Sequence, residues 1–352
     1  MSVTQQADAG RTDRVTIGDV AERAGVSVAT VSRVVNDRYG VSRETTERVR
    51  KVIDELGYAS SLVAQGMRSQ RTGVIGVLMS RIEPFGTEIL KAVSESLQDS
   101  GHELIVFCPA SEHAEGWERR SLARLGDSLV DGALLVAPTV VDVSTDRPLV
   151  AVDPHVGASH LSTVSAENHE GALAATRHLV EIGHRRIGFL GGRQDLESSR
   201  QRETGYRRAL MDAGIDFDPT LVQHGDFTEA GAVAPARQLL ALSDRPTAIF
   251  AANDRSALSL VRTADELGLR VPDDLSVVGF DNIPEAAQAT PPLTTVDQSL
   301  HALGRAAITM LLELIDRDGP GAEEPVHHTL PTELVLRRST APPGNPDRTE
   351  QR

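Results

Sequence analysis

Hydrogen-bonding side chains near the N-terminus have the types and the spacing that contact with DNA requires. Thr30, Ser32 and Arg33 fall on the polar face of a predicted helix at residues 28–35, and Ser27 stands before it as a helix cap. A guanidinium group can donate two hydrogen bonds to guanine, whereas hydroxyl groups suit phosphate oxygens. The pattern therefore predicts a helix that reads a base edge with Arg33 and is positioned by its hydroxyl groups.

Two short helices and a tight turn would position these side chains. Thr16 and Asp19 predict the start of a first helix, because the threonine hydroxyl can accept from a first-turn N–H group. Gly25 predicts its end, since glycine adopts the left-handed conformation without a Cβ clash. Val28 and Ala29 then open the second helix, where they can contact thymine methyl groups. This is the layout of a helix-turn-helix motif, whose second helix enters the major groove.

From residue 73 onwards the chain alternates apolar strands with amphipathic helices. Strands are predicted at residues 74–79, 103–107, 132–136, 149–152, 186–190, 247–251 and 275–279, with intervening helices that include residues 85–100, 169–182, 202–213 and 255–267. Such alternation predicts an α/β fold in which parallel sheets carry helices on both faces.

The composition is that of a folded protein large enough for two or three domains. The chain has 352 residues, of which 40% are hydrophobic and 24% are charged. Its longest apolar runs, such as residues 74–79, are far too short to span a bilayer, and residues 1–14 lack the apolar core of a secretory signal. The single cysteine, Cys108, excludes an intrachain disulfide and a cysteine-based metal site. We therefore expect a cytoplasmic protein without a cofactor.

The net charge of −14 becomes compatible with DNA binding once it is divided along the chain. Residues 1–72 carry 11 Lys and Arg against 9 Asp and Glu, a net charge of +2. The remainder carries 25 Lys and Arg against 41 Asp and Glu, a net charge of −16. The positive charge therefore lies beside the predicted helix-turn-helix, where phosphate contact requires it. DNA would repel the acidic remainder, so the expected contact is confined to the N-terminal part.

The N-terminal motif resembles that of LacI/GalR-family transcriptional regulators. The residues that carry the resemblance are Ala21, Ala24-Gly25-Val26-Ser27, Thr30-Val31-Ser32-Arg33-Val34 and Asn36. Residues 41–58 look like the family's third helix, and residues 183–190, 272–281 and 292–298 look like its regulatory core, in the family's order. The resemblance extends over about residues 15–338. It implies a three-helix DNA-binding head, with Asn36 among its DNA contacts, followed by two α/β lobes of the periplasmic-binding-protein type with a ligand cleft between them.

The resemblance also implies which residues would contact a small-molecule effector. Five of them match family positions, namely Ser80, Asp153, Arg202, Asn253 and Asp281. Amides, carboxylates and a guanidinium group can chelate adjacent hydroxyl groups, and Phe85 and Phe227 could supply an apolar face for a sugar ring. Helix capping is the competing interpretation for each Asn and Asp, and we favour capping for Asp254. A sugar is the leading effector class, with nucleobases and nucleosides as alternatives.

The segment after the third helix departs from the family pattern. Relatives carry Tyr-x-Pro-Asn there, followed by a hinge helix whose leucine enters the minor groove, whereas this chain reads Tyr58-Ala59-Ser60-Ser61. The proline is absent, Gly66 weakens a helix by ~1 kcal/mol, and Met67 occupies the leucine position. Methionine is still an apolar wedge that can unstack a base step. We expect a hinge helix that forms only on DNA and when two chains pair.

Together these features predict a sequence-specific transcriptional regulator, by its resemblance a repressor. One small head contacts too few groups for tight binding, so we expect a homodimer on a pseudopalindromic operator. A ligand that favours one angle between the lobes would change DNA affinity by ~1–3 kcal/mol, and the sequence leaves its sign open. A regulator that responds to a protein partner is an alternative. The expected segments are residues 1–14 (disordered), 15–59 (helix-turn-helix head), 60–72 (hinge), 73–338 (effector binding and dimerisation) and 339–352 (disordered tail).

Two other classes of protein are disfavoured by the sequence. Gly126-Asp127-Ser128-Leu129 matches the nucleophile tetrad of GDSL-type hydrolases, but the Asp-x-x-His that should follow occurs only upstream, at Asp99 and His102. We interpret Gly126 and Asp127 as the end of a helix instead. His327 and His328 are expected at the surface rather than as metal ligands. A periplasmic sugar-binding protein would need an export signal and no helix-turn-helix, so we expect a DNA-binding protein that is not an enzyme.

Overall fold

The computed structural model describes residues 15–35, 39–56, 71–109, 116–140, 145, 147–155, 160–317 and 324–344, apart from the side chains of residues 126–128. The chain divides into two compact units, Met1–Thr72 and Gly73–Arg352. Asn36 lies outside the described residues, as does most of the predicted hinge, including Met67. The same holds for residues 1–14 and for residues 345–352 of the predicted tail.

The N-terminal unit contains the three helices that the sequence predicts. They are α1 (Ile17–Ala24), α2 (Val28–Val35) and α3 (Arg43–Leu56). Thr16 and Asp19 form a reciprocal capping box at the start of α1, and Gly25 ends it at φ 65°, in the left-handed region. One face of each helix is buried in a shared core of Val20, Ala21, Ala24, Val31, Val34, Val49 and Val52. Local caps and a small valine and alanine core thus define this unit.

The C-terminal unit is built on two six-stranded sheets. The N-lobe sheet has the order β11-β5-β4-β3-β1-β2, and all of its neighbouring strands are parallel. Its strands are β1 (Val74–Met79), β2 (Glu103–Phe107), β3 (Gly132–Val136), β4 (Leu149–Val152), β5 (Ser162–Ala166) and β11 (His327–Leu330). Strands β1, β3 and β4 are buried along their whole length, as expected for a parallel sheet covered on both faces.

The C-lobe sheet has the order β12-β10-β9-β8-β6-β7. Its strands are β6 (Ile187–Gly191), β7 (Val222–His224), β8 (Ala248–Ala251), β9 (Ser276–Asp281), β10 (Thr294–Asp297) and β12 (Glu333–Val335). Only the edge strand β12 runs antiparallel to its neighbour, among the described pairs. The predicted α/β fold with two parallel-dominated sheets is confirmed.

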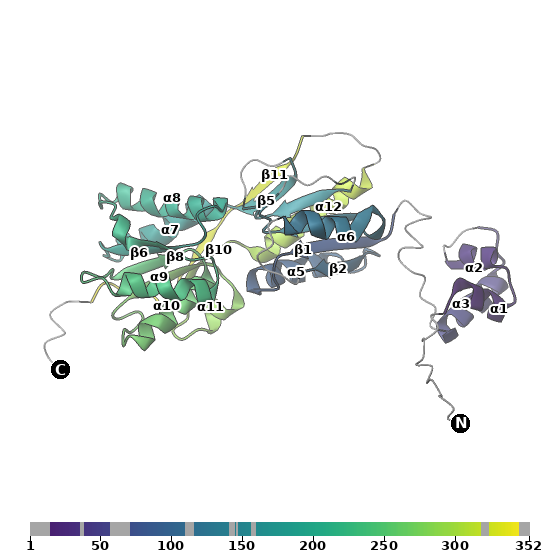
Figure 1. Ribbon diagram of the computed structural model, residues 1–352, viewed down its shortest axis with the longest axis horizontal. Coiled ribbons are helices and arrows are strands. Elements are labelled where there is room, and N and C mark those ends of the chain that lie inside the picture. Colours follow the sequence, from purple (N-terminus) through teal and green to yellow (C-terminus); the bar gives the residue numbers. More distant parts are fainter. Residues whose placement is uncertain are drawn as a thin grey trace, which may run out of the picture. The chain divides into compact units, whose positions relative to one another are not determined.

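Helices cover both faces of each sheet (Figure 1). The N-lobe carries α5 (Pro84–Ser96), α6 (Trp117–Leu129) and α12 (Leu300–Asp316), and the C-lobe carries α7 (Asn168–Glu181), α8 (Glu197–Asp212), α9 (Glu229–Leu240), α10 (Asp254–Glu266) and α11 (Pro284–Gln288), with a 3-10 turn at Pro219–Leu221. The chain passes between the lobes three times, after β5, after β10 and after β11. These crossings place the carboxyl ends of both sheets at the boundary between the lobes, where a ligand site is expected.

The polar strands are those that the sequence did not predict. The apolar strands β1 to β4 have the predicted bounds, whereas Ser162–Ala166 and His327–Leu330 lack an apolar run and form strands because they pair with each other. His327 and His328 lie in β11 with exposed side chains, as expected. Side-chain periodicity identifies a strand with a buried apolar face and misses a strand of mostly polar residues.

The structure corrects the predicted start of the disordered tail at residue 339. Ser339 is fully buried, and its backbone carbonyl accepts from the Val277 N–H at 2.8 Å. Its hydroxyl donates to the Val277 carbonyl at 2.6 Å and accepts from the Thr294 N–H at 2.8 Å. The Ala341 carbonyl lies 2.9 Å from His184 Nε2. Residues 339–341 therefore continue along β9, because they satisfy buried backbone groups there, and composition alone does not reveal such pairing.

Candidate DNA-reading face and effector cleft

Helix α2 presents an exposed face that begins at its first residue. Val31 and Val34 are buried in the core of the head, whereas Val28, Ala29 and Arg33 are exposed. Val28 keeps 47% of its surface accessible. The sequence therefore buries one face of α2 against the head and leaves on the other the three side chains predicted to meet base edges.

Two of the four predicted phosphate-contacting hydroxyl groups, those of Thr16 and Ser27, act as helix caps in this structure. The Ser27 hydroxyl accepts from the Thr30 N–H at 3.1 Å and lies 2.9 Å from the Thr30 hydroxyl. The Thr16 hydroxyl accepts from the Asp19 N–H at 3.3 Å and donates to Asp19 Oδ2 at 2.7 Å. Thr16 and Ser27 are exposed, and Thr30 and Ser32 are half-buried. A hydroxyl binds a phosphate oxygen by donating its proton, and a hydroxyl that caps a helix by accepting can still donate that proton.

A cavity of about 60 Å³ lies between the two lobes of the C-terminal unit. Its lining comes from both lobes and consists of Glu83, Phe85, Ala137, Asp153 and His155 from the N-lobe and Ser198, Arg202, Phe227, Asn253 and Asp281 from the C-lobe. Six of the seven predicted effector-binding residues line this one cavity. The seventh, Ser80, is not in the lining; its backbone carbonyl lies 3.5 Å from the Cys108 sulfur.

Backbone strain is concentrated around the cavity. Seven described residues other than glycine have positive φ, and four of them line the cavity: Ala137 at 47°, Asp153 at 47°, Phe227 at 67° and Asp281 at 116°. Such conformations are uncommon outside glycine and cost roughly 1–3 kcal/mol each. Residues held in this way are characteristic of sites where a side chain must point in one direction. Ala137 and Asp153 directly follow β3 and β4, Asp281 is the last residue of β9, and Phe227 lies between β7 and α9.

A buried ion pair forms the C-lobe wall of the cavity. Arg202 is 3% exposed, and its Nη1 lies 3.4 Å from Asp281 Oδ1 and 2.5 Å from the Ala252 carbonyl. Its Nε donates to Asn168 Oδ1 at 2.8 Å. The guanidinium carbon lies 3.8 Å from the ring centroid of Phe280, a cation–π distance. Arg202 is thereby fixed in one orientation beneath the cavity.

The structure changes the roles that the sequence suggested for Asn253 and Asp254. Asn253 caps α10, since its Oδ1 accepts from the Ser256 N–H at 3.0 Å, and its Nδ2 donates to the Phe227 carbonyl at 3.0 Å. Asp254 is not the cap, so that interpretation is wrong. Its Oδ2 accepts from the Ile283 N–H at 2.9 Å and its Oδ1 from the Thr295 hydroxyl at 2.5 Å. Asp254 ties the loop after β9 to β10, and Asn253 both caps the helix and holds Phe227.

Four contacts join the lobes around the cavity. Glu83, at the start of α5, forms an ion pair with Arg255 of α10. The His155 Nδ1 lies 3.0 Å from the Ser198 hydroxyl, and Asn168 Nδ2 donates to Asp153 Oδ1 at 3.3 Å. The rings of His155 and Phe227 lie nearly parallel, 10° apart, with centroids 6.3 Å apart. The cavity is therefore enclosed by side chains that would separate if the lobes opened.

Burial shifts the protonation of the groups around the cavity. It raises the pKa of Asp281 well above the ordinary value, and Arg202 offsets part of this effect. Burial also raises the pKa of Asp254 to about 7 and lowers that of His155. His155 is therefore neutral at pH 7, and its ring can stack on a neighbour without carrying charge.

The residues that sequence reasoning missed have signals that are recognisable afterwards. Ser198 lies four residues before Arg202 on α8, so the two share a helix face. His155 stands two residues after Asp153, and Ala137 directly follows β3, both at the carboxyl ends of strands. Glu83 precedes Pro84, which is a frequent first residue of a helix. Glu83 lines the cavity and also pairs with Arg255, and that pairing has no local signal.

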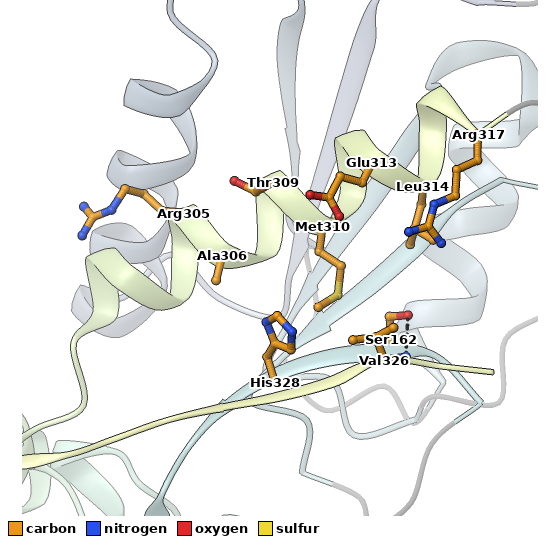
Figure 2. Close-up of a pocket in the computed structure, with 10 residues that line it drawn as sticks. All are labelled: Ser162, Arg305, Ala306, Thr309, Met310, Glu313, Leu314, Arg317, Val326 and His328. Carbon is orange, nitrogen blue, oxygen red and sulfur yellow. Dashed lines mark hydrogen bonds between the residues drawn. The ribbon is translucent and has the colours of Figure 1, made fainter. Parts of the chain in front are cut away.

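A second pocket lies within the N-lobe, away from the boundary between the lobes. Figure 2 shows it between α12 and the strands β11 and β5, with a cavity volume of about 290 Å³. The close-up draws Met310 directed from α12 towards His328 of β11, with Arg305 and Glu313 further along the helix. None of the residues predicted to bind an effector lies in it.

The residues of the hydrolase tetrad lie within a helix. Gly126 to Leu129 form the last turn of α6, which continues to Leu129 instead of ending at Gly126 as expected. Among the residues that the structure describes, no group of three or more His, Cys, Asp or Glu side chains could hold a metal ion. No helix in the described ranges is long and apolar enough to cross a membrane.

The two units together define a class: a helix-turn-helix head attached to a two-lobed ligand-binding core. A model of bacterial regulatory proteins of the lacI family matches residues 16–61, and one of a periplasmic binding protein-like domain matches residues 176–340. The HTH-type transcriptional repressor PurR of Photobacterium profundum is 36% identical over 92% of this chain and 98% of that protein. PurR of Pectobacterium atrosepticum is 39% identical over 93% of this chain and 97% of that protein. The chain belongs to the LacI family of transcriptional repressors, and the relatives are regulators, not enzymes.

Solved structures agree with this assignment. The Lac repressor dimer bound to operator and the anti-inducer ONPF has a TM-score of 0.80 at 30% identity, over 94% of this chain and all of that one. A CelR–cellobiose complex has a TM-score of 0.69 at 35% identity, over 93% of this chain and all of that one. The whole architecture, head and lobes together, is thus that of LacI-type DNA-binding repressors.

Proposed function

We propose that this repressor binds a pseudopalindromic operator as a homodimer and that a small molecule in the inter-lobe cavity sets its affinity for DNA. The observation that carries the proposal is a single cavity whose ten lining residues come from both lobes. A ligand that touches both lobes binds one lobe angle better than another, which is the condition for coupling. The coupling is reciprocal and amounts to ~1–3 kcal/mol.

The proposed DNA contacts divide into base readers and positioning groups. Val28, Ala29 and Arg33 are exposed on α2 and would meet base edges. The positioning groups at the phosphates would be Thr16, Ser27, Thr30 and Ser32, to which the family resemblance adds Asn36, with Met67 as the minor-groove wedge. A single head offers few contacts, which supports a dimer with two heads on two half-sites.

Two classes of ring-shaped effector are supported by different observations. The carboxylates of Asp153 and Asp281 can accept from sugar hydroxyl groups, and a solved relative is a cellobiose complex. The nearly parallel rings of His155 and Phe227 suit a flat heterocycle, and the sequence relatives named PurR favour a purine-type ligand. In either case the cavity of about 60 Å³ is small, so the lobes must open for entry.

Selection of bound genomic fragments by the full-length protein tests the DNA half of this proposal and yields the operator. Binding to that operator is then measured with and without cellobiose, ribose, adenine and adenosine. A change of roughly 5- to 150-fold in affinity with one of them, absent in a Phe227→Ala variant, supports the effector half. A stable monomer that binds a single half-site at full affinity contradicts the dimer. DNA affinity that is the same with every compound contradicts these effector classes.

A further inference from the structure

The charges that face the inter-lobe cavity are balanced within the protein. Three carboxylates line it, Glu83, Asp153 and Asp281, against one lining guanidinium, Arg202. A second cation, Arg255, lies outside the lining and pairs with the lining residue Glu83. Even with Asp281 protonated, Glu83 and Asp153 match the two arginines, so the cavity has no net positive charge to offer a ligand.

Neither arginine is available as an anion site. Arg202 is buried against Asp281, the Ala252 carbonyl and Asn168. Arg255 and Glu83 are about three-quarters covered, at 24% and 30% exposure, so their pairing is only partly screened by water. The nearby Arg193 lies outside the lining and is bound by both carboxylate oxygens of Asp195, at 3.0 and 2.5 Å. His155 is neutral, because burial lowers its pKa.

The carboxylates also act on one another. Besides burial, the negative charges of Asp254, Asp153 and Glu83 contribute to the raised pKa of Asp281, against the opposing effect of Arg202. A site that already disfavours the ionised form of its own carboxyl group will disfavour a second anion more strongly, because a phosphate brings about two negative charges. Hydroxyl and N–H donors, by contrast, find unused acceptor capacity there.

From these contacts we infer that the cleft selects an uncharged effector and rejects phosphorylated or carboxylated compounds, and that Glu83 enforces this by holding Arg255. The inference rests on the proposed function, since it concerns the ligand of the same cavity. Within the sugar class, the inference predicts that a free sugar binds and a sugar phosphate does not. Within the purine class, it predicts that a base or nucleoside binds and a nucleotide does not. Glu83 is thereby a specificity-determining residue that belongs to the N-lobe, opposite the arginine it controls.

Calorimetric titration of the full-length protein with matched pairs tests this inference. The pairs are ribose and ribose 5-phosphate, glucose and glucose 6-phosphate, and adenosine and adenosine 5′-monophosphate, with inorganic phosphate as a probe that needs no knowledge of the effector. For wild type we expect no binding of inorganic phosphate at millimolar concentration. The phosphorylated member of any pair should bind at least about 100-fold more weakly than its uncharged counterpart.

The variant Glu83→Gln releases Arg255 and should raise affinity for inorganic phosphate at least about tenfold. Glu229→Gln is the matched control, because Glu229 pairs at 2.5 Å with Arg262, two turns further along α10 and outside the cavity. It should behave as wild type. Phosphate binding by wild type that Arg255→Ala abolishes overturns the inference, as does a Glu83→Gln variant that gains nothing. If no uncharged compound binds, the effector half of the proposed function fails, whereas the phosphate titrations still decide this inference.

Discussion

The head and the cleft place their functional residues in opposite ways. In the head, Val28, Ala29 and Arg33 lie within six residues of one helix and face solvent. In the cleft, the lining runs from Glu83 to Asp281 in sequence and includes Arg202, which is 3% exposed. These three head side chains can therefore change with little loss of stability, whereas several cleft residues hold the lobes together as well. The two regions should respond differently to the same kind of substitution.

The largest expected effect lies in the cleft. Arg202→Ala leaves Asp281, Asn168 and the Ala252 carbonyl without their buried donor, and should lower the free energy of unfolding by ~3–5 kcal/mol. Urea unfolding, followed by the fluorescence of Trp117, the single tryptophan, measures it. Arg200→Ala on the same helix is the control; Arg200 is half exposed and should contribute less than ~1 kcal/mol. Equal effects of the two variants would remove the distinction between cleft and surface.

The next effect concerns pH and again belongs to the cleft. The pKa of Asp254 is raised to about 7, so its protonated form is favoured in the folded state. The stability that the Asp254 carboxyl group contributes is therefore fully present below its pKa in the unfolded chain, near 4. This contribution is lost as pH rises through its folded-state pKa of about 7. Asp254→Asn cannot titrate, so the variant should lack this decline, which is on the order of a few kcal/mol. Urea unfolding of wild type and of Asp254→Asn between about pH 4 and about pH 7 measures this difference. If the free energy of unfolding of both proteins changed with pH in the same way, the raised pKa of Asp254 would be contradicted.

In the head, a substitution should change recognition and leave stability alone. Arg33→Ala removes the exposed guanidinium and should reduce discrimination between operator and mismatched DNA by ~1–3 kcal/mol. Its free energy of unfolding should stay within ~0.5 kcal/mol of wild type. Fluorescence anisotropy with the selected operator and a scrambled duplex separates the two effects. An equal loss on both duplexes would make Arg33 a phosphate contact instead of a base reader.

The smallest effect tests the local caps that hold the head together. Thr16→Ala removes the capping box at the start of α1 and should destabilise this helix by ~1 kcal/mol. Hydrogen exchange of the full-length protein should then show faster exchange in α1 and unchanged protection in β1, β3 and β4. Glu22→Ala, an exposed position in the middle of α1, is the control. Unchanged exchange in α1 would mean that the core of the head, not the cap, fixes this helix.

The sequence predicted the parts of the molecule that depend on near neighbours. The capping box of Thr16 and Asp19, the left-handed Gly25 and the buried strands β1, β3 and β4 all follow from residues a few positions apart. The polar strands β5 and β11, the ordered residues 339–341 and the role of Asp254 did not follow, because each depends on a partner far away in the chain. Of the six predicted residues that line the cleft, Asp153, Arg202, Asn253 and Asp281 were found through a family resemblance. Phe85 and Phe227 were predicted as an apolar face for a sugar ring.

What the sequence determined by itself is therefore the head, whose helix caps and valine and alanine face lie within about forty residues. The tertiary structure alone decided which side chains meet in the cleft. Glu83 and Arg255 are 172 positions apart, and His155 and Ser198 are 43 apart. Helix and strand signals come from interactions a few residues apart, whereas an ion pair between lobes depends on how the chain crosses between two sheets. The balance of charge in the cavity, and with it the proposed choice of ligand, exists only once the lobes are in place.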